Sequence, residues 1–368
     1  MQKIILLLLF SIGFSFYTVA QSGKLKTQNV VIITFDGLRW QELFGGVDSV
    51  LLYNETFTKF SPETEELIAM YWKSSPEERR KTLMPFFWNT IAKQGQLYGN
   101  RWKGNLVNVT NEMWFSYPGY NEILTGFADP GIRSNNKINN ENQTVLEFVN
   151  QQKGFQGKVA AFGSWDVFPF IINTERSKIP VNAGFEQPKN AKLTEKEKLL
   201  YELQNQIPEE WSSVRFDAFT HHFAKEYIQK NKPRLLYISY GETDDFAHDG
   251  VYDDYIKSAH QTDAFIADLW GFLQNHSFYK DKTTFIITTD HGRGTLPIEN
   301  WQHHGREIVD SDQIWMAVLG PDTPALGEVT TAGQLYQNQV AKTAATLLGL
   351  DYKNTKEVGA VITSALKK

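Results

Sequence analysis

The segment TTFIITTDHG, residues 283–292, places an unbroken apolar and β-branched run directly before an aspartate and a histidine. An apolar run of this length, without alternating polar residues, is typical of a strand that is buried on both faces of a parallel sheet. Two earlier segments repeat the pattern: NVVIITF before Asp36, and RLLYISY, residues 234–240, before the sequence GETD. A fourth apolar run, QIWMAVL, occupies residues 313–319. These four runs predict strands of one sheet.

Helical patterns lie between the predicted strands. Residues 85–95 begin with proline and end with glycine, as helices often do. Residues 216–231 and 252–275 carry apolar side chains at three- and four-residue spacing. Alternation of buried strands with helices predicts a doubly wound α/β fold, in which helices flank a mostly parallel sheet. Ligands of such sheets bind at the carboxyl ends of the strands, which is where the acidic motifs of this chain occur.

The domain organisation is predicted to be simple. Residues 24–368 are expected to form a single domain, because no internal repeat or clear linker interrupts them. Two polar, helix-prone stretches near residues 48–81 and 165–211 fit the strand–helix alternation poorly. We interpret both as cap insertions around the ligand-binding face of the sheet.

Residues 1–20 have the features of a secretory signal peptide. Lys3 supplies a positive charge, residues 4–16 are almost entirely apolar, and TVA at residues 18–20 offers small residues for cleavage. The alternative is a membrane anchor, but the apolar run is shorter than the roughly 20 residues that a spanning helix needs. We therefore expect a periplasmic or secreted protein without a membrane span after signal removal.

Composition argues against several classes of function. The net charge is −5, and basic residues are interleaved with acidic ones, whereas a protein that binds nucleic-acid polymers needs a clustered basic surface. The chain contains no cysteine, which excludes disulfides, thiolate zinc sites and cysteine nucleophiles. Hydrophobic residues make up 41% of the chain, enough for a sizeable core. The sequence carries no indication of the oligomeric state.

Carboxylates and imidazoles occur where the predicted strands begin or end. Asp244 and His248 are four residues apart, so a helix or turn would point both side chains the same way. The other candidates are Asp36, Asp290, His291 and the pair His303-His304. Imidazole together with carboxylate suits Zn²⁺ or Mn²⁺ and does not suit Ca²⁺, which prefers oxygen ligands. Each motif alone could be a turn or a surface pair, but their joint occurrence predicts a metal site.

These motifs, taken in order, resemble those of the alkaline phosphatase superfamily, nearest its nucleotide pyrophosphatase/type I phosphodiesterase branch. The series is VVIITFDG, SYPGYNEILTG, GETDDFAHDG, IITTDHG and then HHG before a strand, and it spans roughly residues 29–321. The resemblance implies an alkaline phosphatase-like catalytic domain that hydrolyses phosphoesters with two divalent metal ions. Zn²⁺ is the expected metal, and Mn²⁺ is the alternative.

The resemblance also implies how the metals are held. One ion would be held by Asp244, His248 and a late histidine, and the other by Asp36, Asp290, His291 and the hydroxyl oxygen of Ser116. In the family, the late histidine is followed by Gly or Thr and a short stretch to a strand. This register selects His304, with His303 as the alternative.

The nucleophile implied by the resemblance is Ser116. In phosphodiesterase-like relatives, a Thr or Ser lies two residues before a proline, and Thr-Gly follows seven and eight residues after that proline. SYPGYNEILTG, residues 116–126, has this spacing. Ser116 would form a phosphoryl-serine that water then hydrolyses, while two cations hold the attacking and leaving oxygens. Asn135 would donate to a phosphoryl oxygen; because this interval is two residues shorter than in relatives, Asn136 is the alternative.

Three other functions use the same scaffold. A sulfatase has the same spacing around its nucleophile, which becomes formylglycine, but arginine is expected four residues later, where this sequence has Tyr120. Cofactor-independent phosphoglycerate mutase has a serine nucleophile but acts on cytosolic metabolites, which disagrees with the predicted export. An inactive binding module would not be expected to keep every ligand-type residue. The sequence therefore favours a hydrolase of small-molecule phosphoesters, with diesters slightly preferred over monoesters.

Overall fold

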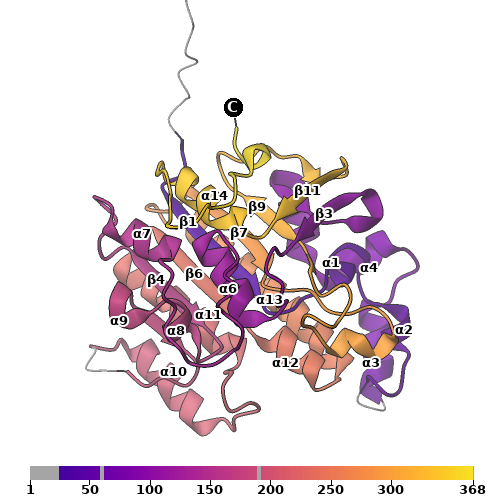
Figure 1. Ribbon diagram of the computed structural model, residues 1–368. Helices are drawn as coiled ribbons and strands as arrows, with labels where there is room; N and C mark the ends of the chain where they lie inside the picture. The colour runs from indigo at the N-terminus through magenta and orange to yellow at the C-terminus, as the bar shows by residue number, and fades with distance from the viewer. Residues whose placement is uncertain (1–24, 59–61, 189–191, 368) are drawn as a thin grey trace, which may run out of the picture.

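The computed structural model describes residues 25–58, 62–188 and 192–367, so the predicted signal peptide lies outside the described residues. An eight-stranded sheet forms the centre of the molecule (Figure 1). Its strands are β1 (Asn29–Phe35), β2 (Gln96–Tyr98), β4 (Val159–Gly163), β5 (Val181–Ala183), β6 (Leu235–Tyr240), β7 (Thr283–Thr289), β9 (Met316–Leu319) and β10 (Gly327–Glu328). Their order is β10-β2-β9-β7-β1-β6-β4-β5. The predicted α/β fold with a mostly parallel sheet is confirmed.

The middle of the sheet consists of the three strands that the sequence predicts most clearly. β1 lies between β6 and β7 and is parallel to both, with Val31 opposite Leu236 on one side and Phe285 on the other. All residues of these three strands are buried. The continuous apolar runs are therefore explained by a sheet that is covered on both faces.

Successive residues of β1 contribute to two separate hydrophobic cores, because side chains of a strand alternate between its faces. Val31 and Ile33 pack in the core formed with α11 (Asp217–Asn231) and α13 (Tyr252–Gln274). Val30 and Ile32 pack in the core formed with α6 (Ser116–Thr125), α7 (Val145–Gln151) and α14 (Gln339–Leu347). The result is a three-layer molecule with helices on both faces of the sheet (Figure 1).

The predicted fourth strand differs from the prediction in two ways. Residues 313–319 form two strands, β8 (Gln313–Ile314) and β9, which are interrupted at Trp315. β8 joins β3 (Asn105–Asn108) and β11 (Gly333–Tyr336) in a second sheet of order β11-β3-β8, whereas β9 pairs antiparallel with β7. Trp315 is fully buried at the break, and its indole N–H donates to the Leu38 carbonyl at 2.9 Å.

Helices α11 and α13 follow the predicted segments closely, and residues 85–94 are helical with a π-helical turn over Phe87–Ile91 that precedes α5 (Ala92–Gln94). The segment 48–81 forms α2 (Ser49–Leu52), α3 (Pro62–Tyr71) and α4 (Pro76–Leu83), which pack near α1 (Trp40–Gly45) and α13. The segment 165–211 forms α8 (Phe168–Ile171), α9 (Thr174–Ser177) and α10 (Glu195–Gln206), and it also contributes edge strand β5. The role of these segments as caps stays a prediction. Among the described residues, no helix is both long and apolar enough to cross a membrane.

Candidate active site

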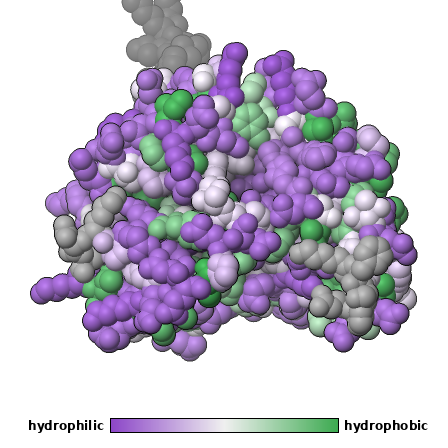
Figure 2. Space-filling view, turned by 90° about the horizontal axis from the view of Figure 1, so that it is seen from below, coloured by the Kyte–Doolittle hydropathy of each residue, from purple (hydrophilic) through white to green (hydrophobic). Residues whose placement is uncertain are grey.

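The carboxyl ends of β1, β6 and β7 bring the six predicted metal ligands into two groups, on the lower side of Figure 1. The first group is Asp36, Asp290 and His291, and the second is Asp244, His248 and His304. Within each group, one ligand atom from each residue lies within 4.8 Å of the others. Figure 2 views the molecule from this side and shows a largely hydrophilic surface with scattered hydrophobic residues.

The first group is completely buried and presents three polar atoms to one another. Asp36 Oδ1, Asp290 Oδ2 and His291 Nε2 are buried atoms that have no hydrogen-bond partner among the described residues. The Nε2 atom is 3.2 Å from Asp36 Oδ1 and 3.4 Å from Asp290 Oδ2. Buried polar atoms without partners are uncommon, so three that converge on one point indicate a site for a bound group.

The opposite atoms of the same side chains are fixed by neighbouring groups. Asp36 Oδ2 accepts a hydrogen bond from the Tyr120 hydroxyl at 2.7 Å, and Asp290 Oδ1 accepts one from the Gly37 N–H at 3.1 Å. His291 Nδ1 donates to the Gly292 carbonyl at 2.9 Å, which leaves the Nε2 atom to face the carboxylates. Outer contacts of this kind set the tautomer and orientation of metal-binding side chains.

Electrostatics in the first group favour a cation. Burial raises the pKa of Asp36 and of Asp290, and repulsion from neighbouring carboxylates adds to both increases. For His291, burial alone would lower the pKa, but Asp290 and Asp36 outweigh it and raise the pKa to about 9. The group therefore has an excess of negative charge, which a metal ion would neutralise.

The second group begins at α12 (Glu242–His248). The start of this helix is fixed by Asp217 of α11, whose carboxylate accepts hydrogen bonds from the N–H groups of Gly241 at 2.7 Å and Glu242 at 3.2 Å. Asp244 and His248 lie one turn apart on α12, and Asp244 Oδ2 is 3.3 Å from His248 Nε2. The helix thus places the carboxylate and the imidazole on one face.

His304 completes the second group and connects it with the first. Its Nε2 atom is 2.9 Å from His248 Nε2, and its Nδ1 atom donates to the Trp114 carbonyl at 3.2 Å. The ring stacks on His291 with the ring centroids 3.8 Å apart. His303, the alternative ligand, is exposed and belongs to neither group. The geometry therefore favours His304 over His303.

Ser116 is the first residue of α6 and is buried beside the first group. The next turn of the helix carries Gly119, where a Cβ atom would lie 2.3 Å from the Asp290 carbonyl oxygen, and Tyr120, which contacts Asp36. Glycine at position 119 thus allows the start of α6 to approach the end of β7. A helix N-terminus favours anions because its first N–H groups have no partner within the helix.

Asn135 lies at the same helix N-terminus, where its Oδ1 atom accepts a hydrogen bond from the Tyr117 N–H at 3.0 Å. This contact orients the side-chain amide beside Ser116. The alternative residue, Asn136, instead lines a cavity of about 370 Å³ under the loop that follows α6. The placement therefore favours Asn135 over Asn136 as the residue beside Ser116, the predicted nucleophile.

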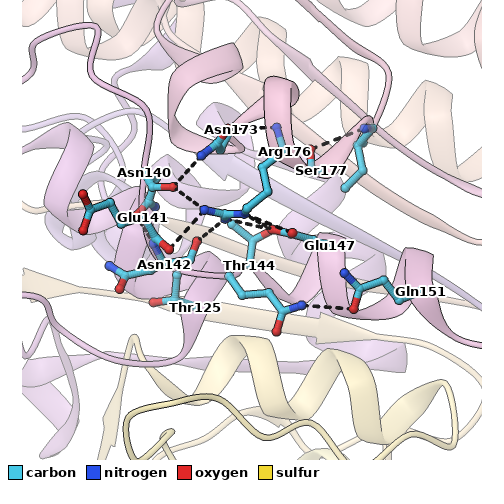
Figure 3. A network of polar contacts seen from close by, with 12 residues as sticks. Thr125, Asn140, Glu141, Asn142, Thr144, Glu147, Gln151, Asn173, Arg176 and Ser177 are labelled. Atoms are coloured by element: carbon cyan, nitrogen blue, oxygen red, sulfur yellow. Dashed lines mark hydrogen bonds and ion pairs between the residues drawn. The ribbon is translucent and has the colours of Figure 1, made fainter.

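The loop that carries Asn135 is fastened at its far end by Arg176 of α9 (Figure 3). The guanidinium donates to the carbonyls of Asn140 at 2.9 Å and Asn142 at 2.8 Å, and it forms an ion pair with Glu147 at 2.8 Å. The Asn140 side chain in turn donates to Asn121 Oδ1 in α6 at 3.0 Å. Arg176 therefore holds this loop against the helix that begins with Ser116.

Two residues of the site could not be assigned from the sequence. Arg293 is buried and donates to Asp244, and Tyr120 donates to Asp36. The only signal for Arg293 was a basic residue directly after the Asp290-His291-Gly292 motif. Tyr120 stood out only because it occupies the position where a sulfatase would have arginine.

Comparisons with known proteins identify the family of the chain. Residues 52–362 match the sequence model of the type I phosphodiesterase/nucleotide pyrophosphatase family. The chain belongs to this family. As a member, it is a phosphoester hydrolase. A search of curated protein sequences found no match.

Solved structures show the same fold at low sequence identity. Wild-type alkaline phosphatase PafA has a TM-score of 0.59 at 11% identity, with 93% of this chain and 99% of that chain covered. Murine ectonucleotide pyrophosphatase/phosphodiesterase 5 has a TM-score of 0.56 at 13% identity, with 92% and 100% covered. Phosphonate monoester hydrolase of Agrobacterium radiobacter has a TM-score of 0.55 at 13% identity, with 92% and 77% covered. The predicted resemblance to the alkaline phosphatase superfamily is confirmed.

Proposed function

We propose that this family member hydrolyses small-molecule phosphodiesters through a phosphoryl-serine at Ser116, with two divalent cations bound by the two ligand groups. The observation that carries this proposal is the convergence of Asp36 Oδ1, Asp290 Oδ2 and His291 Nε2, three buried atoms without partners, beside the start of α6. The mixed imidazole and carboxylate donors fit Zn²⁺, with Mn²⁺ as the alternative. When bound, the cations would neutralise developing charge and acidify the serine hydroxyl.

The residues of the chain have distinct parts in the proposed reaction. The Ser116 oxygen forms a bond to phosphorus as the alcohol oxygen of the substrate departs, and water then cleaves the phosphoryl-serine and restores the hydroxyl. The side-chain N–H groups of Asn135, oriented by its hydrogen bond with the Tyr117 N–H, would donate to a non-bridging oxygen, and the positive end of the α6 dipole would favour the anionic phosphoryl group. Tyr120 and Gly37 would hold Asp36 and Asp290 in their orientations by the hydrogen bonds described above.

A sulfatase is the second candidate, and the position of Tyr120 argues against it. Its side chain is fully buried, and its hydroxyl is engaged with Asp36, so this position cannot supply the arginine expected for formylglycine formation. Ser116 should therefore remain an ordinary serine, which peptide mapping can check. An aldehyde at position 116, or faster turnover of a sulfate ester than of the matched phosphate ester, would contradict the proposal.

The direct test is Ser116→Ala, assayed on paired nitrophenyl phosphodiester, phosphomonoester and sulfate substrates with added zinc or manganese. We expect kcat to fall on the order of 10³-fold, because no other group replaces the nucleophile, while metal content stays unchanged. Ser134→Ala, in the neighbouring loop, is the matched control and should keep its activity. Unchanged kcat in Ser116→Ala would show that water attacks directly or that the reaction occurs elsewhere.

We also propose that the protein is exported to the periplasm or secreted. The support is the sequence of residues 1–20, with a basic start, an apolar run and small residues before the expected cleavage position. Mass spectrometry of exported protein should therefore find mature chains that begin after residue 20. Exported protein that retains Met1 would contradict this proposal.

A further inference from the structure

Arg293 is a buried cation with all its contacts directed into the protein. Its side chain has 0% exposure, and its Nη1 atom donates to Asp244 Oδ1. The Nε atom donates to the Trp301 carbonyl at 2.8 Å, and Nη2 donates to the Gln302 carbonyl. Because the side chain is buried and its Nε and Nη2 atoms each donate to the backbone that leads to His304, the guanidinium is not positioned to contact a substrate.

A glycine makes room for the contact between Arg293 and Asp244. Gly37, which follows the ligand Asp36, has a φ of +59°. A Cβ atom there would lie 2.6 Å from Arg293 Nη1 and 2.9 Å from Asp244 Oδ1. The left-handed backbone and the absence of a side chain at position 37 therefore allow the guanidinium to reach the carboxylate.

Arg293 increases the electrostatic difference between the two ligand groups. With neutral imidazoles, the two carboxylates of Asp36 and Asp290 give the first group a charge of −2. The second group has only the carboxylate of Asp244, and the guanidinium cancels its charge. A dication is attracted much more strongly to the first group, because the Coulomb energy is proportional to the charge and the first group is buried, whereas His248 of the second group is exposed to water.

The contact with Arg293 also makes the two oxygens of the Asp244 carboxylate unequal as metal ligands. Oδ1 is bonded to Arg293, so Oδ2, which lies 3.3 Å from His248 Nε2, is the oxygen that remains for a cation. A ligand oxygen whose partner oxygen is bonded to a guanidinium is a weaker donor to metal. The lower negative charge and the weaker donor oxygen both reduce the affinity of the second group for a metal ion.

We propose that Arg293 makes the position formed by Asp244, His248 and His304 the weaker and exchangeable of the two metal positions. The proposal rests on the two-metal site proposed above. Arg293 acts through Asp244 and is therefore a positioning and charge-setting residue. It weakens metal binding at this position, so that the metal there exchanges with the medium while the metal at the first position is retained.

The test is calorimetric titration of the metal-free full chain with Zn²⁺, followed by metal analysis after dialysis. We expect two binding steps whose dissociation constants differ by at least about tenfold, and one retained equivalent after dialysis. His304→Ala should lose only the weak step, and His291→Ala should lose the tight step. A single step of two equivalents, or loss of the tight step in His304→Ala, would overturn the inference.

Two further variants test the part played by charge. Arg293→Gln keeps hydrogen-bond donors but removes the charge, so the weak step should become at least about tenfold tighter and two equivalents should survive dialysis. Arg293→Lys keeps the charge and should keep the two steps apart. An unchanged ratio of the two dissociation constants in Arg293→Gln would overturn the role of Arg293. The order of the two sites is decided without this variant, by the titrations of His304→Ala and His291→Ala. Absence of any Zn²⁺ binding would overturn the proposed function itself, which is a separate outcome from equal binding at both positions.

Discussion

Asp263, in α13, shows how a single buried carboxyl group can set the pH dependence of stability. Its two oxygens accept hydrogen bonds from the N–H groups of Phe86 at 2.8 Å and Phe87 at 3.0 Å, at the start of the helical segment 85–94. Burial raises its pKa to about 7, although these two hydrogen bonds oppose the increase. The folded protein therefore binds this proton more tightly than the unfolded chain, whose aspartate has a pKa of 3.8. Its contribution to stability is largest below pH 4 and is lost as the pH rises toward 7.

We expect Asp263→Asn to remove this loss, because asparagine keeps an acceptor oxygen and does not ionise. Relative to wild type, the variant should gain on the order of 2–4 kcal/mol of unfolding free energy between pH 5 and pH 8. Urea denaturation at the two pH values measures the difference. Asp268→Asn, on the same helix, is the control: hydrogen bonds to Lys225 and His221 outweigh the effect of burial and lower the pKa of Asp268, so this group is ionised throughout the window. An equal pH response in wild type and Asp263→Asn would refute the prediction.

At the scale of residues, candidate ligands could be predicted from the sequence where they directly follow a predicted strand. Asp36, Asp290 and His291 directly follow buried strands, so the strand pattern alone predicts that they meet at one edge of the sheet. The register of the motif selected His304 with His303 as the alternative, and the structure groups His304 with Asp244 and His248. The role of Arg293 could not be predicted from the sequence, because it depends on the position of Gly37, which is more than 250 residues away in the chain.

At the scale of elements, the loop after α6 depends on α9 for its position. Arg176 joins the loop carbonyls to Glu147 of α7. Its own side chain is 35% exposed, but that of Glu147 is only 7% exposed, so removal of the guanidinium leaves a buried carboxylate without its cation. We expect Arg176→Gln to lower the melting temperature and to lower kcat about tenfold, because Asn135 is no longer held beside Ser116. Thermal denaturation measures the first effect, and steady-state kinetics together with amide hydrogen exchange over residues 131–142 measures the second.

The matched control is Arg133→Gln in the same loop. Arg133 donates to the carbonyl of Pro130, three residues away, at 2.7 Å, and so makes a local contact within its own loop. Its replacement should leave kcat and hydrogen exchange at wild-type values. If Arg176→Gln exchanges no faster than wild type, then the loop is positioned by other contacts.

Elements were predictable from the sequence in proportion to their length. β1 and β7 have seven residues each, and α11 and α13 are longer still, so their apolar patterns are unambiguous. β10, with two residues, is too short to show any periodicity, and its place is set by pairing with β2. The division of residues 313–319 was missed because an apolar run does not reveal that Trp315 fits between two sheets.

At the scale of the whole molecule, the ligand groups join segments that are far apart in the chain. Asp36, the α12 pair, the Asp290-His291 pair and His304 are held on four separate segments, and metal removal would leave buried carboxylates that repel one another. We expect chelators to abolish activity and lower the melting temperature by roughly 5–10 °C, because a ligand that binds only the folded state stabilises it. Calorimetry before and after EDTA, with Zn²⁺ restored as the control, measures this change; a melting temperature unaffected by EDTA would contradict the prediction.

The edges of the large sheet bear on how the protein behaves at high concentration. β5 and β10, the two outer strands, have three and two residues, and Glu328 of β10 is an ion-pair partner of Arg80 at 3.2 Å. Long, flat outer strands offer unpaired backbone groups to other chains and promote amyloid-like association, whereas short and charged ones do not. Most of the β-forming sequence of this protein is enclosed in the middle of the sheet. The folded enzyme should therefore resist edge-to-edge aggregation even when it is crowded.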